Sequence, residues 1–237
     1  MLEVSNLDCV HGERRLFHDV SFLLRSGEGL LITGENGSGK TSLLRMLVGL
    51  TPPFIGTINW KTRLIKHLGA EYRRELLYCG HPLGLKDSLS ATENLQSIAS
   101  LVNEPVELSV VQDALEHIGL QGSAHMPVRA LSQGQKRRVS LARLFLSRRT
   151  LWVLDEPLTA LDTKASQHVA QAVDRHLDDG GIAVITTHQD MALASPLQTE
   201  LPAPSWPLSP NYFRYNFGAY GACCGNWAVG SLCYLAA

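Results

Sequence analysis

The sequence has almost no excess of charge of either sign. Its 21 Lys and Arg residues nearly balance 22 Asp and Glu residues, which leaves a formal net charge of −1 at pH 7. A nucleic-acid-binding domain usually carries a basic patch that neutralises phosphates, so we expect no nucleic-acid partner. The 45% hydrophobic and 18% charged residues are typical of a soluble globular protein, and 237 residues suffice for one large domain with a sizeable core.

Cysteine is scarce and forms no metal-binding pattern. The five cysteines are an odd number without any CxxC pair: Cys9, Cys79, Cys223, Cys224 and Cys233. This argues against a disulfide framework or a zinc site and favours a reducing cytosol. The beginning of the chain, MLEVSNLDCVHGERR, also lacks the apolar segment of a signal peptide.

Alternating apolar strands and amphipathic helices predict an α/β fold with a mostly parallel sheet. Residues 29–33 (GLLIT), 150–154 (TLWVL) and 182–187 (IAVITT) are expected to be buried strands, and shorter strands are expected near the N-terminus. Residues 87–147 differ, because ATENLQSIASLV and SVVQDALEHIGL have helical spacing with no strand between them. We interpret this stretch as a helical lobe inserted into the α/β core.

The last part of the sequence has another character. From residue 191 only Glu200 and Arg214 are charged, and prolines, glycines and cysteines are frequent. The glycines and asparagines make a poor membrane-spanning helix, which needs about 20 mostly apolar residues. We therefore place one domain at residues 1–190 and interpret residues 191–237 as an atypical tail, flexible or produced by a misread sequence.

A phosphate-binding loop is the strongest motif. GENGSGKT at residues 34–41 matches GxxxxGK[ST] between an expected strand and an expected helix. Glycines let backbone N–H groups surround phosphates, the lysine reaches the β- and γ-phosphates, and the hydroxyl after it holds Mg²⁺. The expected nucleotide-binding residues here are Gly34, Glu35, Asn36, Gly37, Ser38, Gly39, Lys40, Thr41 and Ser42.

Two carboxylates follow the strand in LWVLDEP. Asp155 stands at the end of a strand that is apolar throughout, so the sheet would place it beside the phosphate loop as a second Mg²⁺ ligand with Thr41. Glu156 would polarise the attacking water as general base, an effect worth about 10²–10⁴-fold in rate. We expect ATP and Mg²⁺ as cofactors.

A second anion-binding segment, LSQGQ at residues 131–135, precedes a basic helix. Its Ser132 would also suit the N-cap of that helix, because capping and phosphate binding use the same groups. We interpret Arg137, Arg138 and Arg143 on this helix as solvated or salt-bridged.

The order of these motifs resembles the ATP-binding cassette (ABC) ATPases, whose signature sequence is LSGGQ. The resemblance implies a P-loop NTPase fold of the ABC type, with antiparallel N-terminal strands. It also implies a head-to-tail homodimer, in which Ser132, Gly134 and Gln135 of one subunit contact the ATP bound by the other. Asp162 would contact the partner subunit, and His188 would touch the γ-phosphate. Other P-loop classes fit less well; for example, the guanine-binding NKxD motif is absent.

Two residues depart from the family pattern. His81 stands where ABC proteins normally have a glutamine that contacts metal, water and the membrane partner, and His11 replaces the aromatic residue that stacks on adenine. An imidazole still binds a metal or stacks on a base, but it is smaller and titrates near pH 6.5. Weaker selectivity for adenine is therefore a hypothesis.

Residues 2–192 more narrowly resemble the ATP-binding subunit of the bacterial cytochrome c maturation system, the heme exporter ATPase. GHPLGLK and the THQ ending of GGIAVITTHQ carry this narrower resemblance. It implies a peripheral protein on the cytoplasmic face of the inner membrane that pairs with integral membrane permease subunits. An ATPase subunit for another cargo, and a soluble ABC ATPase outside transport, remain open alternatives.

Overall fold

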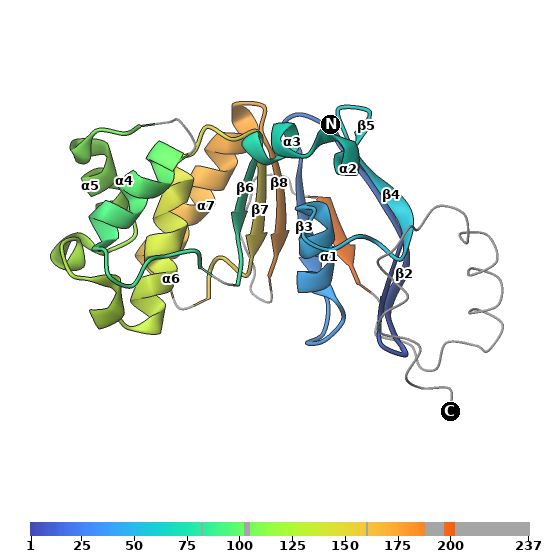
Figure 1. Cartoon of the computed structure of the whole chain (residues 1–237), viewed down its shortest axis with the longest axis horizontal. Helices are drawn as coiled ribbons and strands as arrows, with labels where there is room; N and C mark the ends of the chain where they lie inside the picture. The colour runs from blue at the N-terminus through green and yellow to red at the C-terminus, as the bar shows by residue number, and fades with distance from the viewer. Residues whose placement is uncertain (82, 102–104, 160, 188–196, 202–237) are drawn as a thin grey trace.

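The computed structural model describes residues 1–81, 83–101, 105–159, 161–187 and 197–201. These residues form two sheets with helices around them (Figure 1). The helical lobe lies at one side of the five-stranded sheet, and the four-stranded sheet lies at the other (Figure 1). His188, predicted to touch the γ-phosphate, lies outside the described residues, as do residues 202–237 of the tail.

The four-stranded sheet is antiparallel, with strand order β2-β1-β4-β5. It comprises β1 (Leu2–His11), β2 (Arg14–Leu24), β4 (Ile55–Trp60) and β5 (Arg63–Leu64). Leu2, Val4, Leu7 and Cys9 of β1 are buried, and the pairing of β1 with β2 shifts register between Val4 and Leu7. This irregularity keeps the apolar residues on one face although the alternation by two is interrupted.

The five-stranded sheet is parallel, with strand order β6-β7-β8-β3-β9. It comprises β3 (Gly29–Thr33), β6 (Leu76–Cys79), β7 (Leu151–Asp155), β8 (Ile182–Thr186) and β9 (Leu197–Glu200). Every residue of β7 and β8 is buried, as expected for strands covered on both faces. Because the strands are parallel, their carboxyl ends meet at one edge of the sheet.

Strand β9 lies in the segment that the sequence analysis assigned to the tail. It pairs with β3 from Leu30–Leu197 to Thr33–Glu200, and Leu201 is buried after it. The parallel sheet thus extends beyond residue 190, where we had placed the domain boundary. The sequence did not predict this strand, because four residues are too few to show a periodic pattern. The few charges and many prolines around it also favoured a tail.

The two faces of the parallel sheet belong to two cores. Leu151 and Val153 of β7 pack with α1 (Lys40–Leu47) and the antiparallel sheet, whereas Trp152 and Leu154 pack with the helical lobe and α7 (Thr163–Asp178). This division follows from the alternation of side chains along a strand. The sheet is therefore held between the nucleotide-loop helix α1 and the lobe.

The remaining helices are short. The lobe contains α4 (Ala91–Leu101), α5 (Leu108–His117) and α6 (Gln133–Ala142), with 3₁₀ turns η1 (Gln121–Ser123), η2 (Val128–Ala130) and η3 (Arg143–Phe145). Two single-turn helices, α2 (Ile65–Leu68) and α3 (Ala70–Arg74), connect the sheets. In the part of the chain that the structure describes, no helix combines the length and apolarity needed to cross a membrane.

Candidate active site

The loop between β3 and α1 has the backbone of a phosphate cradle. Gly34, Gly37 and Gly39 have φ angles of 136°, 84° and 100°, in the region that favours glycine. At Gly39 the loop also approaches β2 closely, since a Cβ atom there would lie 2.8 Å from Phe17 Cδ1. Glycine at this position is therefore required by both backbone and packing.

Two polar side chains of the loop are positioned for an anion. Lys40 Nζ donates hydrogen bonds to the carbonyls of Gly34 and Glu35 over 2.7 and 2.9 Å, so the ammonium is held inside the loop. Burial lowers the pKa of Lys40, against the opposing effect of the Glu156 and Asp155 carboxylates. Ser38 Oγ is buried and has no hydrogen-bond partner among the described residues. A phosphate group would satisfy it, together with the free N–H groups at the start of α1.

Asp155 lies beside the loop, at the end of β7. Thr41 Oγ1 donates to Asp155 Oδ2 over 3.0 Å, and Thr186 Oγ1 of β8 donates to Asp155 Oδ1 over 2.7 Å. Both carboxylate oxygens are thus oriented, and only 5% of the residue is exposed. A hydroxyl next to a carboxylate is an oxygen pair of the kind that Mg²⁺ binds, so Thr41 and Asp155 fit the expected metal site.

Glu156 has an unusual backbone conformation. Its φ is 49°, which is uncommon for a residue other than glycine, asparagine or aspartate. Its N–H donates to Thr186 O and Thr186 Oγ1, each over 3.1 Å, and its Oε2 accepts from Thr159 Oγ1 over 3.3 Å. The second carboxylate therefore stands at a constrained turn directly after Asp155.

Arg137 corrects our interpretation of the basic helix. It is half-buried, and its NH2 group donates to Asp155 O over 2.8 Å and to Glu156 O over 2.5 Å. Arg143 is also directed inward, with NH1 donating to Tyr78 O over 3.4 Å. Arg138 is salt-bridged, as interpreted, to Asp162 over 2.9 Å. The sequence could not separate these arginines, because their partners come from other segments of the chain.

The signature segment is a helix cap in this chain. Gln135 N donates to Ser132 Oγ over 3.2 Å, and Ser132 N donates to Gln135 Oε1 over 2.9 Å, which forms a capping box at the start of α6. Gly134 follows in the first turn of the helix. Helix α6 belongs to the lobe and lies apart from α1, across the parallel sheet (Figure 1). The two segments predicted to bind anions, the phosphate loop and the signature segment, are thus separate within one chain.

The other predicted residues lie around these two elements. Asp162 caps α7, with Oδ1 accepting from Ala165 N over 2.9 Å. His81 is exposed, and its Nε2 lies 3.3 Å from Arg137 NH1. His11 is exposed at the end of β1, two residues beyond Cys9, which pairs with the Phe17 that contacts Gly39. The β1–β2 turn therefore stands on the phosphate-loop side of the antiparallel sheet.

The phosphate loop, the strand ending in two carboxylates and the capped signature helix, in this order and on this fold, define an ABC ATPase. The family model for ABC transporters matches residues 17–159. The fold is shared with a putative ABC transporter ATP-binding protein from Pyrococcus furiosus (TM-score 0.73, 24% identity, 84% of this chain and 96% of that chain). It is also shared with the dimeric ATP-binding cassette MJ0796 bound to ADP and phosphate (TM-score 0.72, 22% identity, 86% and 98%).

Comparison with curated relatives identifies a narrower group within this family. The cytochrome c biogenesis ATP-binding export protein CcmA of Pseudomonas aeruginosa is 49% identical over 193 residues, which are 81% of this chain and 95% of the relative. The CcmA protein of Dechloromonas aromatica is 49% identical over 201 residues, 85% of this chain and 98% of the relative. The chain belongs to the ABC transporter family and, within it, to the CcmA group of cytochrome c biogenesis ATP-binding export proteins. It is an ATP-hydrolysing subunit of the ABC type.

Proposed function

We propose that this protein couples ATP hydrolysis to heme handling for cytochrome c biogenesis, as a peripheral subunit on the cytoplasmic face of the inner membrane. Relatives that are 49% identical over most of the chain are named cytochrome c biogenesis ATP-binding export proteins, which supports a role in this process. The observation that best supports ATP hydrolysis is the hydrogen bond of 3.0 Å from Thr41 Oγ1 to Asp155 Oδ2, because it joins the phosphate loop to the carboxylate at the strand end.

The residues of the loop would hold the nucleotide. The N–H groups of residues 34–42 and the buried Ser38 hydroxyl bind phosphate oxygens, and Lys40 exchanges its contacts with the loop carbonyls for the β- and γ-phosphates. Thr41 and Asp155 would hold Mg²⁺, which neutralises phosphate charge when bound. Glu156 accepts a proton from the attacking water as general base. His188 would contact the γ-phosphate, and His81 would stand at the rim of the metal site.

Dimerisation would complete each site. Solved structures with this fold include dimeric cassettes. In a head-to-tail pair, Ser132, Gly134 and Gln135 of one subunit would contact the ATP held by the other, and Asp162 would contact the partner subunit. For this, the Ser132 hydroxyl exchanges its contact inside the capping box for the γ-phosphate. The separation of α6 from α1 within one chain supports this arrangement (Figure 1).

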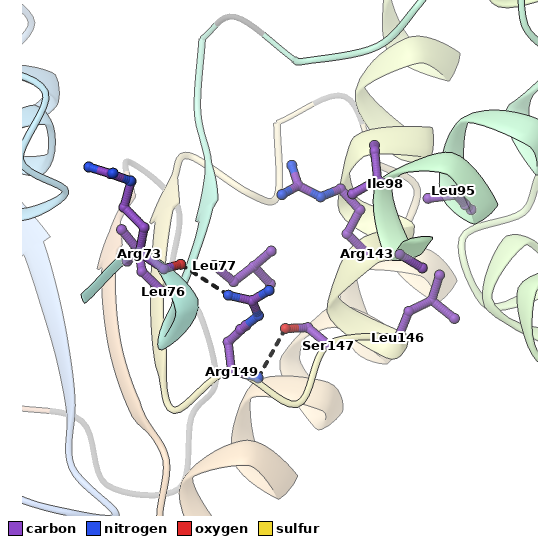
Figure 2. A pocket seen from close by; sticks show the side chains of 10 residues that line it. Arg73, Leu76, Leu77, Leu95, Ile98, Arg143, Leu146, Ser147 and Arg149 are labelled. Carbon is purple, nitrogen blue, oxygen red and sulfur yellow. Dashed lines mark hydrogen bonds between the residues drawn. The ribbon is translucent and has the colours of Figure 1, made fainter. Parts of the chain in front are cut away.

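A hollow between the lobe and the parallel sheet supports docking of integral membrane permease subunits. Leu95 and Ile98 of α4 face Leu77 of β6 across it, and the arginines Arg73, Arg143 and Arg149 stand around it (Figure 2). Arg149 is partly used by the fold itself, since NH1 donates to the carbonyls of Arg73 and Arg74. Leucine side chains with cations around them suit an amphipathic segment that ends in acidic or carbonyl groups.

The test is a pull-down from detergent-solubilised membranes with the Glu156→Gln protein loaded with ATP. Recovery of small heme-handling membrane subunits is the expected result. Recovery of an unrelated permease would keep the ATPase and overturn the cargo. Recovery of no membrane protein would overturn the transport function in favour of a soluble ABC ATPase. A Lys40→Ala protein is the matched control, because it would not be held in the ATP-bound state.

A further inference from the structure

We propose that Arg137 is the positioning residue through which the helical lobe holds the general base Glu156 in place. The inference rests on the proposed function, in which Glu156 accepts the proton of the attacking water. From the sequence alone, Arg137 is interpreted only as a solvated or salt-bridged cation.

The contacts of Arg137 join three segments that are distant in sequence. Its NH2 group donates to two successive carbonyls, Asp155 O at 2.8 Å and Glu156 O at 2.5 Å. Its NH1 group lies 3.3 Å from Nε2 of His81, which precedes the lobe. One guanidinium thus bridges the signature helix α6, the end of β7 and the segment that leads from β6 into the lobe.

The turn that Arg137 grips needs support. With φ of 49°, Glu156 occupies a backbone region that is unfavourable for a residue of this kind and persists only where the surroundings hold it. On its amino side, the Glu156 N–H donates to Thr186 of β8. On its carbonyl side, the Glu156 oxygen accepts a hydrogen bond from Arg137 NH2. The core strand and the lobe therefore hold the backbone of the same residue, Glu156, on its two sides.

The chemistry of the side chain fits this role. A guanidinium is planar and presents several N–H donors in a fixed geometry, so it can bind two carbonyls and a ring nitrogen at once. A lysine is a single point of charge on a flexible stem and cannot reproduce that geometry. Because Arg137 is on α6, displacement of the lobe would move the Glu156 carbonyl and with it the carboxylate. The position of the lobe would then set the activity of the base.

The first test compares Arg137→Lys and Arg137→Gln with Lys136→Gln, a neighbour on α6 whose cation contacts the exposed Asp87. We expect kcat for ATP hydrolysis to fall about 10- to 100-fold in both Arg137 variants, because small displacements of a reacting group have effects of that order. The dissociation constant for a fluorescent ATP analogue should change less than about 2-fold, because the contacts that bind the nucleotide itself remain in place. Lys136→Gln should retain both values.

The second test is a double-mutant cycle with Glu156→Gln, read by single-turnover hydrolysis of radiolabelled ATP. If Arg137 acts through Glu156, adding Arg137→Gln to Glu156→Gln should slow the residual reaction less than about 2-fold, because groups that act as a unit are not additive. Full additivity of the two losses would overturn the proposal. So would wild-type kcat in Arg137→Lys, or failure of Arg137→Lys to fold, which would assign the residue to stability alone. Normal hydrolysis by Glu156→Gln by itself would instead overturn the general base of the proposed function.

Discussion

Thr41 and Asp155 are 114 positions apart in the sequence, yet Thr41 Oγ1 donates to Asp155 Oδ2 over 3.0 Å. The contact exists because β3 and β7 both end at the same edge of the parallel sheet, with only β8 between them. Thr186 at the end of β8 donates to the other carboxylate oxygen of Asp155. The ends of β7 and β8 and the start of α1 thus build one oxygen-rich site beside the phosphate loop.

Lys40→Ala should abolish ATP turnover. The substitution removes the ammonium that now donates to two loop carbonyls and that would bind the β- and γ-phosphates. Steady-state phosphate release measures the effect, and binding of a fluorescent ATP analogue should also weaken. Lys66→Ala, at an exposed position outside the site, is the control and should hydrolyse ATP normally. Turnover by Lys40→Ala at the normal rate would contradict the phosphate-loop assignment.

Glu156→Gln should bind ATP but not hydrolyse it. The amide keeps the size of the side chain and cannot accept a proton from water, so kcat should fall by at least about 10²-fold. The ATP-loaded variant should accumulate as a closed dimer, which light scattering coupled to size exclusion would detect. A monomer that persists with saturating ATP and Mg²⁺ would count against the nucleotide-sandwich dimer.

Gly39→Ala should destabilise the phosphate loop. The residue has φ of 100°, and its new Cβ would lie 2.8 Å from Phe17 Cδ1. We expect a loss of about 1–3 kcal/mol in the free energy of unfolding, measured with urea, and weaker ATP binding. Gly122→Ala is the matched control, because nothing lies within 4 Å of its added Cβ. Equal stability of the two variants would show that the loop tolerates a side chain at residue 39.

Asp162→Asn should lower stability in a way that depends on pH. The hydrogen bond from the Ala165 N–H, aided by the Arg138 guanidinium, holds the pKa of the Asp162 carboxyl below its usual range. Since the folded pKa is depressed, the stabilisation is present above the unfolded pKa of about 3.9 and is lost as pH falls through the folded value. The melting temperature should therefore drop at pH 7, and the difference from wild type should shrink towards pH 3.

Asp178→Asn is the control for that experiment. Asp178 is exposed at the other end of the same helix, α7, where a negative charge is unfavourable to the helix dipole. Its replacement should leave the melting temperature unchanged or slightly higher at pH 7. An equal drop in both variants would refute the stabilising role of the Asp162 charge.

Because His11 replaces an aromatic residue, we expect the protein to discriminate weakly between adenine and guanine nucleotides. The imidazole at the end of β1 offers less stacking area than the aromatic residue that it replaces. We expect ATP and GTP to bind with dissociation constants within about 10-fold of each other, and His11→Tyr to raise the preference for ATP. Competition against a fluorescent nucleotide measures both. A strong preference for ATP in the unsubstituted protein would refute the hypothesis.

The sequence alone determined the class of this protein and its nucleotide chemistry. The phosphate loop, the carboxylate pair after 151–155 and the capped signature helix are local patterns, because each depends on the order of a few neighbouring residues. The apolar runs also predicted the buried strands β3, β7 and β8, since strands covered on both faces must be apolar throughout.

Only the tertiary structure decided how these patterns meet. Strand β9 is too short to show periodicity, and its place beside β3 depends on the sheet edge that β3 offers. Arg137 and Arg138 are adjacent in sequence, yet one grips the backbone of Asp155 and Glu156 while the other pairs with exposed Asp162. Successive residues on a helix point about 100° apart, so their roles depend on what packs against each side. Local sequence carries no information about that packing until the lobe and the sheet are joined.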